Sequence, residues 1–88
     1  MARKKVFLVV ANIKTRNVER IVEGPYESKK QDKVTDELLF VRVKELYRHY
    51  PFSEFDIITA RSESFEMLKK NFPEFHGWEG AMRENLFL

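Results

Sequence analysis

The sequence predicts a small α+β domain in which a three-stranded sheet is covered by a long helix. An apolar segment with two alternating faces opens the chain, and a long segment with the apolar period of a helix follows it. Proline and glycine residues separate these segments from a further strand and a second helix. The expected order is therefore β-β-α-β-α, and residues 1–88 are expected to form a single domain.

The composition indicates a packed interior and excludes several classes of protein. Hydrophobic residues make up 43% of the chain, which contains eight Phe and no Cys, so disulfides and thiolate chemistry are excluded. The longest apolar run, 6–11, is far shorter than the ~20 residues that cross a bilayer, and no signal-peptide cleavage pattern follows it. We therefore expect a cytoplasmic protein with no membrane partner.

Residues 5–13 are expected to form the central strand of the sheet, because both of its faces are apolar. Those faces are made by Val6, Leu8 and Val10 and by Phe7, Val9, Ala11 and Ile13. The polar residues 12–17 form a turn, and residues 18–23 form an outer strand that pairs with the first. Gly24 and Pro25 are expected to end this strand, because proline lacks the N–H group that a ladder needs.

A long helix is expected over residues 29–50. Ser28 is a favourable N-cap residue, Gln31 completes a capping box, and Pro51 prevents the helix from continuing. At ~100° per residue, one arc of this helix is apolar and is expected to cover the sheet. The arc contains Leu39, Phe40, Val43, Leu46, Tyr47 and Tyr50.

A second apolar stripe lies on the opposite side of the same helix. Val34, Leu38 and Val41 follow the spacing i, i+4, i+7, although a helix with one buried face does not need them. They are expected to be covered by the C-terminal tail or by another chain. The alternative is scatter, because isolated apolar residues are common on protein surfaces.

Residues 55–61 are expected to form the third strand, and residues 64–72 a second helix that Ser62 or Ser64 caps and Pro73 ends. The tail that follows, residues 74–88, is rich in apolar side chains. Within it, Trp78, Met82 and Leu86 fit one helical stripe. A tail of this composition is expected to pack on its own domain or on a partner.

The sequence lacks the residue patterns of common catalytic and metal sites. His49 and His76 have no Cys, Asp or Glu at metal-ligand spacing, and the serines stand at expected helix caps. The three glycines form no phosphate-binding loop. We therefore expect neither an enzyme nor a cofactor.

The function that the sequence favours is protein interaction, as an intracellular regulatory or binding module that associates with itself or with another protein. A homodimer would bury apolar side chains that one small domain has no need to expose. The candidate interface residues are Val34, Leu38, Val41, Trp78, Met82 and Leu86.

The alternative function is nucleic-acid binding through a basic hairpin and a helix N-terminus. Residues 1–34 hold nine Lys or Arg against four Asp or Glu, whereas residues 35–88 hold seven against ten. Free amides at a helix N-terminus also favour an anion. The candidate contacts are Lys14, Arg16, Lys29, Lys30 and Lys33. Acidic residues within the same stretch, Glu23, Glu27 and Asp32, reduce this attraction.

Overall fold

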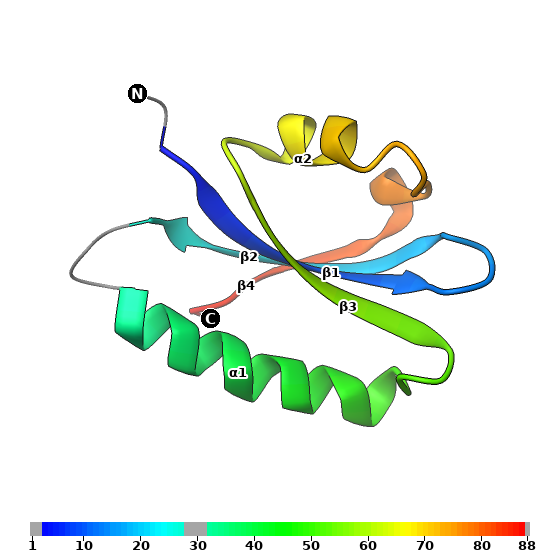
Figure 1. Ribbon diagram of the computed structural model, residues 1–88, viewed down its shortest axis with the longest axis horizontal. Coiled ribbons are helices and arrows are strands. Elements are labelled where there is room, and N and C mark those ends of the chain that lie inside the picture. The colour runs from blue at the N-terminus through cyan, green and yellow to red at the C-terminus, as the bar shows by residue number, and fades with distance from the viewer. Residues whose placement is uncertain (1–2, 28–31, 88) are drawn as a thin grey trace.

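The computed structural model describes residues 3–27 and 32–87, which form a compact α+β domain with a mixed sheet (Figure 1). The strands are β1 (Lys5–Asn12), β2 (Val18–Tyr26), β3 (Phe55–Ser62) and β4 (Met82–Asn85). The helices are α1 (Asp32–His49), α2 (Phe65–Asn71) and a short 3₁₀ helix, η1 (Trp78–Gly80).

The sheet of the described residues has four strands in the order β3-β1-β2-β4, so the expected three-stranded sheet was wrong. β1 is antiparallel to both β2 and β3, and β4 is parallel to β2. The fourth strand comes from the tail, which returns to the sheet and pairs with β2. As a result β2 is an interior strand rather than the outer strand that we expected.

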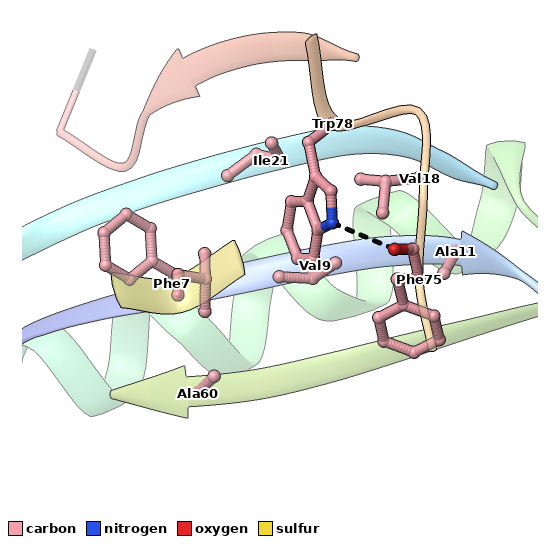
Figure 2. Packing of buried hydrophobic residues seen from close by; sticks show 9 residues of the cluster. Phe7, Val9, Ala11, Val18, Ile21, Ala60, Phe75 and Trp78 are labelled. Carbon is pink, nitrogen blue, oxygen red and sulfur yellow. Dashed lines mark hydrogen bonds between the residues drawn. The ribbon is translucent and has the colours of Figure 1, made fainter. Parts of the chain in front are cut away.

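β1 is central and covered on both faces, as the two apolar faces of residues 5–13 predicted. Its residues Val6, Leu8 and Val10 belong to the apolar cluster under α1. Phe7, Val9 and Ala11 belong to a second cluster, which contains residues of α2 and η1 (Figure 2). α1 and α2 therefore lie on opposite faces of the sheet (Figure 1).

β2 continues through Gly24 and Pro25 to Tyr26, so the expected end of this strand was wrong. The ladder contains an irregularity at this point, because Lys5 pairs with Tyr26 whereas Phe7 pairs with Glu23. The additional residue of β2 forms a bulge, and a bulge accommodates a proline that cannot donate to the ladder.

α1 spans Asp32–His49 and ends just before Pro51, as expected, whereas the expected start at residue 29 lies outside the described residues. The expected capping box of Ser28 and Gln31 lies outside the described residues. Leu39 and Leu46 are buried against the sheet, with Val43 and Tyr50 packed beside them. Phe40 does not belong to this buried arc, because 63% of its surface is exposed.

α2 has the N-cap that the sequence predicted, and it is Ser64. Its hydroxyl oxygen accepts a hydrogen bond from the backbone N–H of Met67 at 3.2 Å. Ser62, the other candidate, is instead the last residue of β3 and is buried.

The tail does not form the expected helical stripe, because η1 and β4 have different backbone periods and direct its apolar side chains to different sides. Trp78 is buried on the α2 side of the sheet, where its indole N–H donates to the carbonyl oxygen of Phe75 at 3.3 Å (Figure 2). Leu86 is buried on the α1 side, and Met82 is exposed.

Candidate functional site

The predicted interface residues of the tail are largely used within the chain. Trp78 and Leu86 are core residues of the two apolar clusters. Met82 has 58% of its surface exposed, and its sulfur accepts a hydrogen bond from Arg20. The tail therefore packs on its own domain, which is one of the two outcomes expected from its composition.

The second apolar stripe of α1 is likewise partly buried within the chain and partly exposed. Leu38 is half-buried and packs against the cluster under α1. Val34 and Val41 remain 53% and 52% exposed. The three residues consequently do not form one continuous exposed stripe, and the exposed apolar surface of α1 includes Phe40 on another side of the helix.

The free edge of β3 is a further surface, which the sequence did not predict. Among the described residues, β3 pairs only with β1 and lies at one edge of the sheet. Its eight residues, FDIITARS, contain no Pro, Gly or Lys, and its pairing with β1 is regular throughout. Native edge strands are usually short, bulged or protected by Pro or charged side chains, especially Lys, because an open edge can pair with another strand. The charged residues of β3 are Asp56 and Arg61.

The register identifies the backbone groups that face this free edge. The N–H of Ile13 donates to the carbonyl oxygen of Glu54 at 2.9 Å, in the same register as the β1–β3 ladder. In an antiparallel pair, residues alternate between facing the neighbouring strand and facing away from it. Ile57, Thr59 and Arg61 therefore direct their N–H and C=O groups away from β1.

Two observations identify the flank of α1 that adjoins β3. Asp36 and Arg61 line the same small hollow near the start of the helix. At the other end, the rings of Tyr50 and Phe55 meet edge to face, with centroids 5.1 Å apart. Phe40 lies on this flank by its position in the helical turn, and the Lys44 ammonium is 4.5 Å from its ring centroid. We call this surface the β3 flank: strand β3 with Asp36, Phe40, Lys44 and Tyr47.

The opposite flank of α1 is closed by polar contacts to β4. Arg42 donates to the Glu84 carboxylate at 3.0 Å and to the carbonyl oxygen of Leu86 at 3.3 Å. β4 itself has only four residues, and two of them are charged. The two edges of the sheet are therefore unlike in length: β4 has four residues, whereas β3 has eight, and each strand carries two charged residues.

The candidate anion contacts do not lie together. Lys14 and Arg16 lie in the turn between β1 and β2, at the opposite end of the sheet from the start of α1 (Figure 1). Lys33 lies in the first turn of α1, and Lys29 and Lys30 lie outside the described residues. Among the described residues, Lys14 and Arg16 therefore lie at one end of the molecule and Lys33 lies at the other.

A charge cluster on the α2 side of the sheet accounts for two shifted pKa values. Glu23 accepts hydrogen bonds from Lys5 at 2.8 Å and from Arg83 at 3.1 Å. Burial alone would raise the pKa of Glu23, but the hydrogen bonds and positive charges of Lys5 and Arg83 lower it overall. The hydrogen bond to Glu23 in turn raises the pKa of Lys5.

Two hollows of the described surface are lined partly by polar and charged side chains. One, about 340 Å³, is lined by Asn12, Ile13, Lys14, Ser53 and Glu54. Another, about 210 Å³, lies between α1 and the sheet, where Arg20 and Arg42 are close to the Glu84 carboxylate. No group of three or more His, Cys, Asp or Glu is arranged to hold a metal ion within the described residues.

Comparisons with models of protein families, with curated proteins and with solved structures found no match. Neither of the two α-helices in the described part of the chain has the length and apolar character needed to cross a membrane.

Proposed function

We propose that this chain is a small, non-enzymatic interaction or regulatory module that associates with itself. The single observation that supports the proposal most strongly is the β3 flank. It combines an eight-residue edge strand that has no bulge, Pro or Lys with a phenylalanine that leaves 63% of its surface exposed. Together they offer backbone hydrogen bonds and apolar area at one place.

The energetics of a small chain favour the same proposal. A domain of this length buries only about 60–65% of the surface of its unfolded chain, so its margin of stability is narrow. Association of the folded state with a second chain adds to that margin by mass action.

The proposal is tested by the solution mass, measured by static light scattering over a concentration series that begins at low micromolar protein. Self-association predicts a mass that rises towards twice the 10.6 kDa of one chain. A mass of one chain across the whole series would contradict self-association.

Nucleic-acid binding remains the second candidate, and the positions of the basic residues give it less support. Lys14 and Arg16 are separated from Lys33 by the length of the sheet. Such a binder depends on phosphate contacts and loses affinity steeply with salt. The absence of any mobility shift of DNA or RNA at low salt would remove this candidate.

A further inference from the structure

We infer that the partner on the β3 flank is a second copy of this chain, bound by antiparallel pairing of β3 with β3 about a two-fold axis at Thr59. This inference rests on the proposed self-association and specifies its geometry. Both copies of α1 then lie on the same face of a continuous sheet, because the axis is perpendicular to the sheet.

The backbone geometry of β3 suits such a pairing. In a symmetric antiparallel pair, groups that face outward on one strand must meet groups that face outward on the other. Thr59 directs its N–H and C=O groups outward, so it can pair with Thr59 of the second copy on the axis. Ile57 then pairs with Arg61 of the second copy, whose guanidinium is already paired with the Glu27 carboxylate of its own chain at 2.7 Å.

The position of Phe40 along α1 matches the position of Thr59 along β3. The hollow that Asp36 and Arg61 both line marks one end of the two elements, and the contact of Tyr50 with Phe55 marks the other. Between them α1 advances about 21 Å and β3 about 20 Å, from their rises per residue. Thr59 and Phe40 each lie about one third of the way from the Asp36–Arg61 end. The axis therefore passes at the level of Phe40 along α1, so the two phenylalanines lie at the same level on either side of it.

The charges beside Phe40 are self-complementary about this axis. Asp36 precedes Phe40 by four residues, and Lys44 follows it by four, so all three lie along one side of α1. The two copies of α1 run antiparallel, and Asp36 of one copy therefore faces Lys44 of the other. The symmetry creates this pair twice. This charge complementarity is the reason to choose a second copy over an unrelated extended peptide.

The arrangement is tested by exchanging these charges and measuring the dimer dissociation constant by sedimentation. Asp36→Lys places a new lysine opposite Lys44, and Lys44→Asp places a new aspartate opposite Asp36. Each single variant is expected to weaken the dimer about tenfold or more, because like charges then face each other twice. The double variant, Asp36→Lys with Lys44→Asp, restores complementarity and is expected to dimerise like the wild type.

Mixing the two single variants gives the sharpest result. One contributes two lysines and the other two aspartates, so their heterodimer is expected to form with near wild-type affinity. Lys70→Asp is the matched control, because it makes the same kind of charge change at an exposed residue of α2, on the opposite face of the sheet from α1. It is expected to leave the dissociation constant unchanged. Circular dichroism of every variant separates loss of folding from loss of association.

The outcomes distinguish this inference from the proposed function. Two results would overturn the β3 arrangement but not self-association. In the first, the single variants have the same dimer dissociation constant as the wild type. In the second, the mixture of the two variants dimerises as weakly as each variant alone. A wild type that is monomeric at every concentration contradicts self-association itself. In that case the β3 edge is left for an extended segment of a different protein.

Discussion

Gly77 occupies a conformation that few other residues adopt, and the position of the tail depends on it. Its φ angle is 78°, in the left-handed region. A Cβ atom built at this position would collide with the side-chain amide of Asn17, at the start of β2. The φ angle favours glycine at the point where the chain enters η1, and a larger residue would also displace the side chain of Asn17.

We expect Gly77→Ala to lower the free energy of unfolding by about 1–3 kcal/mol, measured by chemical denaturation. Gly80→Ala is the matched control, because nothing lies within contact of a Cβ at Gly80. It should change the stability by no more than about 0.5 kcal/mol. Equal effects of the two substitutions would show that the tail does not depend on the backbone at Gly77.

Glu23 makes the stability of the fold depend on pH. Its two cationic neighbours lower its pKa below the ordinary value of 4.5. Because the folded-state pKa is the lower one, the carboxylate stabilises the fold above about pH 4.5. This stabilisation disappears as the pH falls through the folded-state pKa.

Glu23→Gln should therefore be less stable than the wild type at neutral pH, and the difference should shrink as the pH falls below 4.5. Urea denaturation of both proteins at several pH values measures this difference. Glu74→Gln, at an exposed position, serves as the control and should show little difference at any pH. If the difference in free energy of unfolding between Glu23→Gln and the wild type stays constant down to low pH, the Glu23 carboxylate is not the source of pH-dependent stability.

At the scale of elements, the tail is part of the core rather than an appendage. Trp78 packs beside Phe65 and Phe75, with ring centroids 6.1 and 6.3 Å away.

Trp78→Ala should lower the free energy of unfolding by about 3–5 kcal/mol, a large part of the stability of a small domain. Met82→Ala should cost no more than about 0.5 kcal/mol, because Met82 is exposed. Thermal denaturation followed by circular dichroism compares them, and similar midpoints for the two variants would contradict this packing.

The elements with strong periodic patterns could be predicted from the sequence. The alternating faces of β1, the end of α1 before Pro51 and the Ser64 cap of α2 are local features, and the structure contains all three. β4 could not be predicted in this way. Its residues, MREN, show no apolar alternation, and the strand exists because the tail pairs with β2.

The β3 flank could not be predicted either, because it depends on strand order. The helical arc of α1 correctly contains Leu39 and Leu46, but it also contains Phe40. Whether the sheet extends far enough to cover Phe40 depends on which strand β4 joins. β4 joins β2, so β3 remains an edge strand and Phe40 stays exposed. No local pattern within residues 29–50 contains that information.

In the whole molecule, the two edges of the sheet differ in length and in their contacts with α1. The β4 edge is four residues long, carries Arg83 and Glu84, and is tied to α1 through Arg42. The β3 edge is twice as long and has an aromatic side chain beside it. Antiparallel pairing at β3 would leave only β4 edges exposed, and short charged edges resist further growth of a sheet. The assembly that follows is a closed dimer.

Amide hydrogen exchange, followed residue by residue by NMR at increasing protein concentration, tests edge pairing most directly. The amides of Ile58 and Ala60 face β1 and should be protected at every concentration, which provides an internal reference. If β3 pairs with β3, the amides of Ile57, Thr59 and Arg61 are expected to exchange rapidly in dilute solution and to become protected as dimers form. Rapid exchange of these three amides at concentrations where light scattering shows a dimer would contradict pairing through β3.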